Sequence, residues 1–137
     1  MSLFNIFNIA SSGMSAQSVR LNITASNLAN ADSVGSSQND VYRARQPVFA
    51  TVMQEAQNGM PLGSVQVKAV VETQTNGREE YKPNHPMADD KGYVYHSNVD
   101  PMSEMANMIS ASRSYQNNVE VANTSKQLLL ATLRLGK

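Results

Sequence analysis

One stretch of the sequence gathers side chains that could bind a metal ion or transfer protons: His85, Asp89, Asp90, His96 and Asp100. Imidazole and carboxylate groups bind divalent ions, but a catalytic zinc helix carries two histidines four residues apart beside a general-base glutamate. Here the histidines are 11 residues apart, with turn-forming residues between them. We therefore expect a solvated turn without a metal ion; a small metal hydrolase that uses His85 and His96 stays as an alternative.

The rest of the sequence offers little further chemistry. It contains no cysteine, which excludes disulfides, thiolate nucleophiles and cysteine-bound metals. It lacks the G-x-S-x-G, G-x-G-x-x-G and phosphate-loop patterns. Positive and negative side chains balance at 11 each, so the phosphate attraction used by most nucleic-acid-binding proteins is missing. We expect no enzyme activity, no catalytic or cofactor-binding residue, no cofactor, no small-molecule substrate and no nucleic-acid partner.

Hydrophobic runs in the sequence are short. The longest aliphatic stretch is Leu128–Ala131, whereas a membrane-spanning helix needs about 20 apolar residues. The first residues contain neither a basic segment nor a long apolar one, which argues against a cleaved secretory signal. We expect a protein that is not inserted in a membrane.

Charge and proline divide the chain into three segments. Residues 1–30 hold a single charged residue, Arg20, and all five prolines lie between Pro47 and Pro101. Long helices avoid proline, whereas turns and strand ends accept it. We predict a mainly α protein with a small β insert: an N-terminal helix over 1–31, a central β and loop module over 32–100, and a C-terminal helix over 101–137.

The N-terminal segment has a seven-residue hydrophobic repeat. Large apolar residues recur at Phe7, Met14, Leu21 and Leu28, and the companion position holds Leu3, Ala10, Gln17 and Thr24. Such a repeat is typical of a helix that packs along another helix. A second apolar set lies on the opposite face, at Ile9, Ala16, Val19 and Ile23. We expect this helix to be contacted from more than one side.

The C-terminal segment repeats the pattern. Asp100 and Pro101 suit the start of a helix, and the repeat continues at Met105, Met108, Tyr115, Val119, Leu129 and Leu133. Two helices of matching periodicity at opposite ends of a chain predict an antiparallel coiled coil. Burial between two helices alone does not offset the entropy of ordering them. We therefore expect neighbouring copies or partners to complete both apolar faces of each helix.

The central segment predicts short strands. Residues 63–71 alternate apolar and polar side chains, and Asn76-Gly77 supplies turn chemistry after them. Asp90-Lys91-Gly92 predicts a turn before a β-rich Tyr93-Val94-Tyr95, while 41–52 is partly extended and 33–40 is a polar loop. We predict a central β-hairpin and loop module whose strand order the sequence leaves open.

Specific motifs in all three segments resemble one family. Ser12–Gln17 (S-G-M-S-A-Q), Arg20–Asn22 and Ala25–Asp32 are similar to the N-terminal signature of bacterial flagellar rod and hook proteins. Glu104-Met105 with Ser112–Val121 is similar to the matching C-terminal signature. Tyr42–Ala44, His85-Pro86 and Asn98–Asp100, together with the short length, resemble the proximal rod proteins within the flagellar basal-body rod protein family. The signature positions are Asn22, Asn27, Leu28, Asn30, Arg113 and Tyr115.

This resemblance implies a structural subunit of the rod, the drive shaft of the flagellar basal body, located within the periplasm. It implies export by the flagellar type III apparatus and helical assembly with other rod proteins and copies of the same chain. A coiled-coil adaptor with a β insert, which would form discrete oligomers, stays as the alternative.

Two further expectations concern side chains. The apolar residues of both repeats are candidates for the assembly interface: Leu3, Phe7, Met14, Leu21, Leu28, Met105, Met108, Tyr115, Val119, Leu129 and Leu133. Asn22, Asn27 and Asn30 are poor helix formers in a predicted helix. Three explanations remain open for each asparagine: a hydrogen bond between helices, capping of the helix end, or exposure to solvent.

Overall fold

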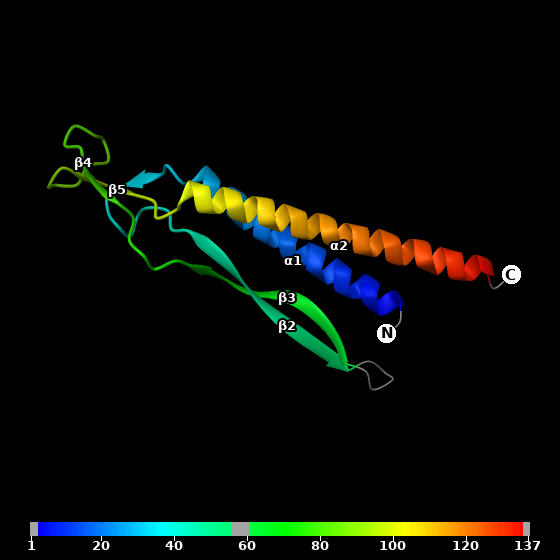
Figure 1. Ribbon diagram of the computed structural model, residues 1–137. Helices are drawn as coiled ribbons and strands as arrows, with labels where there is room; N and C mark the ends of the chain where they lie inside the picture. Colours follow the sequence, from blue (N-terminus) through cyan, green and yellow to red (C-terminus); the bar gives the residue numbers. More distant parts are fainter. Residues whose placement is uncertain (1–2, 56–60, 136–137) are drawn as a thin grey trace.

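The computed structural model describes residues 3–55 and 61–135, with side chains described over 5–53 and 63–134. Two long helices, α1 (Leu3–Ala29) and α2 (Pro101–Leu135), lie side by side along the molecule (Figure 1). The intervening chain forms five strands: β1 (Val34–Gly35), β2 (Arg45–Glu55), β3 (Pro61–Glu72), β4 (Glu79–Tyr81) and β5 (Tyr93–His96). The predicted arrangement of two terminal helices with a β insert is confirmed.

The ends of both helices are capped by short polar side chains. At the end of α1, the Asn30 side-chain amide donates to the Ser26 carbonyl at 2.8 Å. At the start of α2, the Asp100 carboxylate accepts from the backbone amides of Met102 at 3.3 Å and Ser103 at 3.2 Å. These bonds and one from the Ser103 hydroxyl, the largest cause, lower the pKa of Asp100. The predicted cap at Asp100 is confirmed, and Asn30 is the capping asparagine.

The strands β2 and β3 form a long antiparallel hairpin. Their register runs from Arg45 opposite Glu72 at the base, where an ion pair of 3.2 Å joins the two side chains. The predicted alternating strand over 63–71 lies within β3. The pairing shifts between Val48 and Phe49 of β2, whose partners are Ala69 and Val67, so Lys68 of β3 is the extra residue of a β-bulge. Such a bulge increases the local twist.

The strands β1, β5 and β4 form a small antiparallel sheet in that order, at the far end of the molecule from the chain termini (Figure 1). The turn before β5 is built on Asp89, whose carboxylate accepts from the amides of Tyr93 at 2.8 Å and Lys91 at 2.9 Å. Gly92 has a φ of 82°, which glycine adopts without strain. The turn predicted at 90–92 is confirmed.

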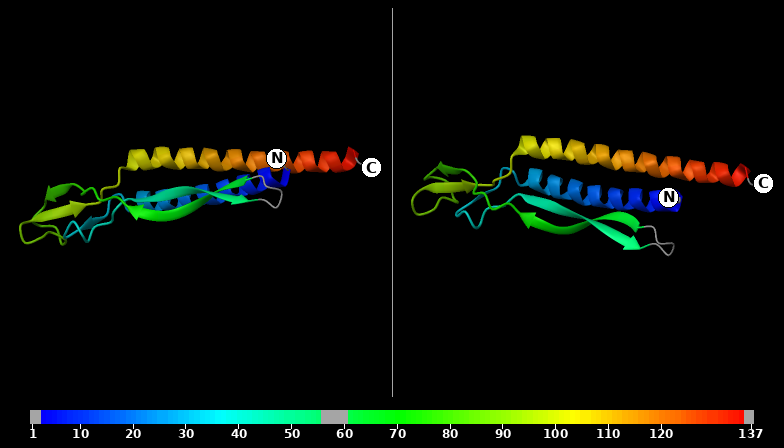
Figure 2. Two further views of the ribbon diagram at one scale, coloured as in Figure 1. Left: turned by 90° about the horizontal axis from the view of Figure 1, so that it is seen from below. Right: turned by 60° about the horizontal axis from the view of Figure 1, so that its bottom comes forward.

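The elements pack so that α1 lies between α2 and the β2–β3 hairpin (Figure 2). Among the described residues the hairpin contacts α1 and not α2. The Val65 amide donates to the Ser12 hydroxyl at 3.2 Å, and Ala16 is 3% exposed. The chain's own hairpin thus covers much of the second apolar face of α1, although Ile9 is 38% exposed. The expectation that neighbouring molecules must supply all of this cover is wrong for α1.

Candidate assembly surface

The face of α2 that meets α1 is built from small and polar residues. Glu104, Ala111 and Ser125 are buried, and Asn118 at the same seven-residue spacing lies against Gly13 of α1. Ala122 is also buried. Small residues let two helix backbones approach closely, so this face forms a tight seam between the helices.

The face of α1 that meets α2 has the same character. A side chain on Gly13 would place its Cβ 2.8 Å from the Asn118 amide nitrogen. Arg20 donates to the Asn107 side-chain oxygen at 3.1 Å, and Asn27 donates to Glu104 at 3.0 Å. These contacts run in opposite directions along the two helices, which are therefore antiparallel, and they repeat every seven residues on α1.

The large apolar residues of the predicted assembly interface lie partly outside this seam. Phe7, Met105, Tyr115 and Leu133 are exposed, and Leu133 is 62% exposed. The other described members are half-buried: Met14, Leu21, Leu28, Met108, Val119 and Leu129. Leu3 begins α1, but its side chain lies outside the described ones. The set stays a prediction for contacts with neighbouring molecules, and its exposed members have the apolar surface that such contacts need.

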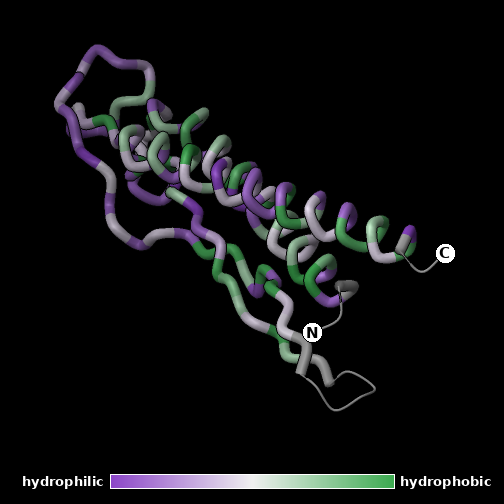
Figure 3. Tube along the Cα trace, turned by 45° about the vertical axis from the view of Figure 1, so that its right-hand side comes forward, coloured by the Kyte–Doolittle hydropathy of each residue, from purple (hydrophilic) through white to green (hydrophobic). Residues whose placement is uncertain are grey.

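Apolar surface concentrates at the two ends of α2. Met102, Met105 and Ile109 are exposed at a spacing of three and seven, which sets them on one face near the start of the helix. Leu128, Leu130 and Leu133 are exposed near its end. Figure 3 shows hydrophobic stretches along both helices, while hydrophilic residues gather at the loops of the small sheet. The helices therefore offer apolar surface to other proteins, as does the β2–β3 hairpin, where Met53, Val70 and Val71 are exposed.

The end of α2 extends past α1 (Figure 1). The pairings of Gly13 with Asn118 and of Asn27 with Glu104, continued along both helices, set Leu3 level with Leu128. Residues 129–135 then extend about 10 Å beyond the first described residue of α1. This part of α2 has no helix of its own chain beside it among the described residues.

A buried polar network joins the two helices to the hairpin, and Asn27 is its centre. Asn27 is 1% exposed, and its amide donates to Glu104 at 3.0 Å and to the Arg45 carbonyl at 2.8 Å. Its side-chain oxygen accepts from the Tyr42 hydroxyl at 2.8 Å and from the Arg45 amide at 3.0 Å. All four hydrogen-bonding positions of the side chain are occupied, so burial costs little.

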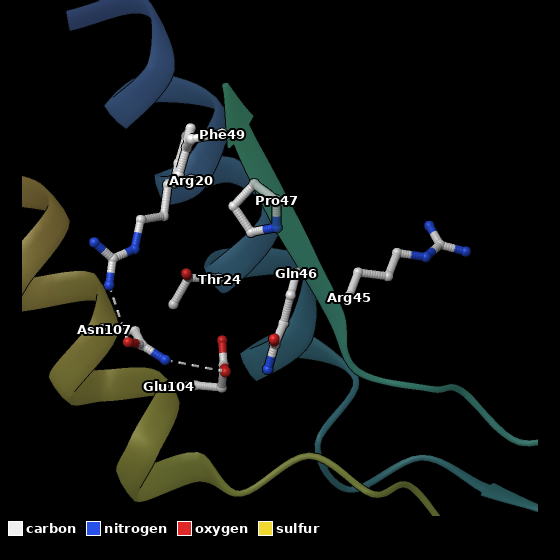
Figure 4. Close-up of a pocket in the computed structure, with 8 residues that line it drawn as sticks. All are labelled: Arg20, Thr24, Arg45, Gln46, Pro47, Phe49, Glu104 and Asn107. Atoms are coloured by element: carbon white, nitrogen blue, oxygen red, sulfur yellow. Dashed lines mark hydrogen bonds between the residues drawn. The ribbon is translucent and has the colours of Figure 1, made fainter. Parts of the chain in front are cut away.

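The network continues across the helix pair beside an open hollow of about 250 Å³ between α1, α2 and β2. Asn107 donates to the Glu104 carboxylate at 3.5 Å and accepts from Arg20 (Figure 4). Figure 4 shows the Arg45 side chain pointing away from this hollow, consistent with its ion pair to Glu72. Arg20, the single charge of the first 30 residues, therefore lies in one hydrogen-bonded chain with the buried Glu104.

The three asparagines of the N-terminal signature have three different roles. Asn27 bonds across the helix pair, Asn30 caps α1, and Asn22 is exposed. The burial of Glu104 was not predicted from the sequence. The spacing could have predicted this burial, because Glu104 lies seven positions before Ala111 and so falls on the same helix face as the small residues of the seam.

The candidate metal-binding residues are engaged in the small sheet and its turn. His96 Nε2 lies 2.9 Å from Glu80 Oε2, and His85 Nδ1 accepts from the Met87 amide at 3.1 Å. Lys82, the largest cause, lowers the pKa of Glu80 together with His96. Within 3–55 and 61–135, no three His, Asp or Glu side chains are grouped to hold a metal ion. In the same ranges, no helix has the length and apolar character required to span a membrane.

Known proteins match both helices and then the whole chain. The family described as flagella basal body rod protein matches residues 7–35, and the family described as flagellar basal body rod FlgEFG protein C-terminal matches 90–135. The flagellar basal-body rod protein FlgC of Yersinia enterocolitica is 53% identical over 137 residues, which cover 100% of both chains. The chain belongs to the FlgC family of flagellar basal-body rod proteins.

Other members of the FlgC family are similar over the same span. The FlgC proteins of Escherichia coli O6:H1 and Salmonella typhimurium are 53% and 51% identical, again over 100% of each chain. The two family matches cover α1 and β1 at one end and β5 and α2 at the other. The matched parts thus include most of the helix pair and the network residues Asn27 and Glu104, whereas Tyr42 and Arg45 lie outside both matches.

Proposed function

We propose that this chain is a structural, non-enzymatic subunit of the rod of the bacterial flagellar basal body, located in the rod within the periplasm. Full-length identity of 53% to a curated FlgC protein carries the proposal. Its neighbours in the rod are copies of itself and other flagellar rod proteins. Nucleic acids and small-molecule substrates are not among its partners, and it is not inserted in a membrane.

The exposed surface of the chain supports an assembling subunit. A compact monomer of 14.9 kDa exposes about 7,000 Å² of surface. This chain exposes 9,504 Å², and the excess includes large apolar side chains on both helices. Apolar surface of this kind on a soluble chain is characteristic of a protein–protein contact. The rod supplies such contacts from several neighbours.

The helix pair forms the inner part of the subunit as an antiparallel coiled coil over 1–31 and 101–137, with the module 32–100 outside it. The seven-residue recurrence of seam residues on both helices supports this arrangement. The assembly interface combines the exposed apolar ends of α2 with Phe7 of α1. Helical stacking of these surfaces builds the shaft, after export of the chain by the flagellar type III apparatus.

Cryo-electron microscopy of isolated basal bodies tests the proposal. We expect density for this chain in an inner helical layer of the rod, with α1 and α2 nearest the axis. The control is a basal body from a strain that lacks the chain, in which this layer is missing. A complete rod in that strain, or purified chain that forms discrete dimers and is absent from basal bodies, would favour the adaptor alternative and contradict the proposal.

The metal hydrolase alternative has a separate test. Elemental analysis of the purified chain measures bound zinc and other divalent metals. We expect no stoichiometric metal, since His85 and His96 are bonded to a backbone amide and to Glu80. One tightly held metal per chain that disappears in His85→Ala and His96→Ala variants would favour the hydrolase.

A further inference from the structure

The small residues of the helix seam do not by themselves select one register. Gly13 faces Asn118, and the residues seven positions away on either side of Asn118 are Ala111 and Ser125. Both are smaller than asparagine, so a slide of α1 by one seven-residue repeat would meet no bulky side chain there. Seams of repeating small residues leave helices free to pair in several alignments.

Polar side chains distinguish the observed alignment from the shifted ones. Asn27 donates to Glu104, and Arg20 donates to Asn107, which in turn donates to Glu104. A slide by seven residues in either direction breaks the Asn27–Glu104 and Arg20–Asn107 bonds. The slide that sets Gly13 against Ala111 brings Arg20 level with Glu104, but it moves Asn27 beyond Pro101, where α2 begins. The slide that sets Gly13 against Ser125 also sets Asn27 against Ala111, whose side chain accepts no hydrogen bond. A buried donor or carboxylate without its partner is strongly unfavourable.

The same network fixes the helix pair to the rest of the chain. Asn27 is held from its other side by the Tyr42 hydroxyl and by both backbone groups of Arg45, at the base of the hairpin. The polar contacts therefore occupy one end of the helix pair, whereas the seam around Gly13, Ala111 and Ala122 is made of small residues. One polar cluster in an otherwise permissive helix interface is a recognised means of selecting register.

We propose that Arg20, Asn27, Glu104 and Asn107 form a register-setting network, in which Asn27 and Glu104 are positioning residues that fix the alignment of α1 with α2. The alignment determines how far α2 extends past α1, because a slide of seven residues changes this extension by about 10 Å. The consequence for rod assembly rests on the proposed function, since the extended end is a surface offered to neighbouring subunits.

Engineered cysteine pairs measure the register directly, because the natural chain has no cysteine. Gly13→Cys with Asn118→Cys reports the observed alignment, and Gly13→Cys with Ala111→Cys or Ser125→Cys reports the shifted ones. Each pair is oxidised in the purified full-length chain, and the disulfide yield is compared. We expect the Asn118 pair to cross-link and the two shifted pairs to remain largely reduced.

The test variant replaces Arg20, Glu104 and Asn107 by leucine, which removes the bonds between helices and leaves Asn27 bonded to Tyr42 and Arg45. We expect cross-linking to spread from the Asn118 pair to the shifted pairs, with helical circular dichroism retained. The conservative Glu104→Gln variant keeps an acceptor for Asn27, and we expect it to cross-link only through Asn118. The matched control replaces the exposed Gln116, Glu120 and Asn123 of α2 by leucine, and we expect the natural register.

The outcomes separate register-setting from ordinary stabilisation. Retention of the Asn118 cross-link alone in the triple-leucine variant, at a lower melting temperature, would overturn the proposal. If the triple variant loses its helical signal, the single Asn107→Leu variant, which breaks the Arg20–Asn107 bond between the helices and the Asn107–Glu104 bond within α2, is read by the same criterion. Because the cross-linking is measured on the isolated chain, a negative result would overturn the register proposal without affecting the proposed rod function. Conversely, absence of the chain from rods would contradict the rod function without affecting the register result.

Discussion

Asn27 makes hydrogen bonds to three other residues, although asparagine is a poor helix former. Asparagine has a low helix propensity because its side chain competes for backbone hydrogen bonds. In α1 the side chain instead bonds to Glu104, Tyr42 and the backbone of Arg45, and thereby joins three segments of the chain. The unfavourable propensity is offset by bonds that a purely helical environment does not provide.

Replacement of Asn27 by alanine should destabilise the fold. The change removes the side-chain partner of the Arg45 amide and carbonyl and leaves the buried Glu104 with only its longer bond from Asn107, and each buried group that loses its partner costs about 1–3 kcal/mol. We expect the free energy of unfolding to fall by about 3 kcal/mol in urea titrations. The matched control is Asn22→Ala at an exposed position of the same helix, which should stay within about 0.5 kcal/mol of the natural chain. Equal effects of the two changes would contradict the role of Asn27.

Asp89 gives the turn before β5 a dependence on pH. The Tyr93 amide is the largest cause that lowers the pKa of this carboxyl below 3.8, and the Lys91 amide and Tyr95 hydroxyl add to it. A lowered pKa stabilises the folded turn above the unfolded pKa, and this contribution is lost as the pH falls through the folded value. The hydrogen bond between Asp89 and the Tyr95 hydroxyl raises the pKa of that hydroxyl.

A nuclear magnetic resonance titration checks this assignment. We expect the Tyr93 amide proton to shift with a midpoint below 3.8 in the natural chain and to lose this transition in Asp89→Asn. Asp90→Asn removes the same charge at the neighbouring exposed position and should leave the transition in place. A midpoint above 3.8 would mean that the turn does not bind the ionised carboxylate.

The sequence predicted the asparagines as unusual without predicting their partners. Tyr42 and Arg45 are 15 and 18 residues from Asn27, beyond a loop whose path no periodicity describes. Capping of α2 by Asp100 was predictable, because a cap involves only neighbours in the sequence. The resemblance to rod proteins identified the signature positions but not what each side chain contacts.

At the scale of elements, the helices and strands follow from the spacing of apolar residues and turn formers. The uncertain step was the choice of which repeat positions face the partner helix. The seven-residue repeat predicts a seam that contains large residues such as Phe7 and Met105. The seam instead includes Gly13, Ala111 and Asn118, since small residues let the backbones approach. The bulge at Lys68 of β3 was not predictable, because it shifts the strand pairing without a residue type that marks it.

The close approach at Gly13 gives a graded prediction. Gly13→Ala adds a Cβ against the far end of the flexible Asn118 side chain, which can move, while alanine raises helix propensity by about 1 kcal/mol. We expect Gly13→Ala to change the free energy of unfolding by less than about 1 kcal/mol. Gly13→Leu should cost about 1–3 kcal/mol, because its larger side chain must separate the helices.

A double variant provides the control for Gly13. Asn118→Ala removes the side chain that opposes the new leucine, so Gly13→Leu with Asn118→Ala should recover part of the lost stability. Urea denaturation of the two single variants and the double variant gives the coupling. Strictly additive effects would indicate that the two positions do not meet.

At the scale of the whole molecule, the chain is a thin body with apolar surface left at its ends. The sequence predicts that neighbouring molecules bury both apolar faces of each helix. The hairpin covers much of the second face of α1, so this expectation holds in full as a proposal only for α2. Periodicity indicated that α1 has two contact faces, but it could not say whether the second partner belongs to the same chain.

Charged substitutions on the exposed face of α2 should prevent assembly without unfolding the chain. Ile109 and Leu133 are 56% and 62% exposed, so Ile109→Asp and Leu133→Asp leave the helix seam intact. We expect unchanged far-ultraviolet circular dichroism but loss of rod completion and swimming in a strain that lacks its own copy, because burial of an unpaired charge is costly. Asn123→Asp at an exposed polar position should swim normally. Normal swimming of both apolar-site variants would exclude these residues from the interface.

The position of α1 between α2 and the hairpin has a consequence for synthesis. The first helix leaves the ribosome before either of its packing partners, because β3 ends at Glu72 and α2 begins at Pro101. The face of α1 toward the hairpin can pack midway through translation, once β3 is synthesised. The face toward α2 has no packing partner until the final quarter of the polypeptide is synthesised. A nascent chain of this protein therefore stays incompletely folded until its last residues emerge. The C-terminal segment decides when the first segment can finish folding.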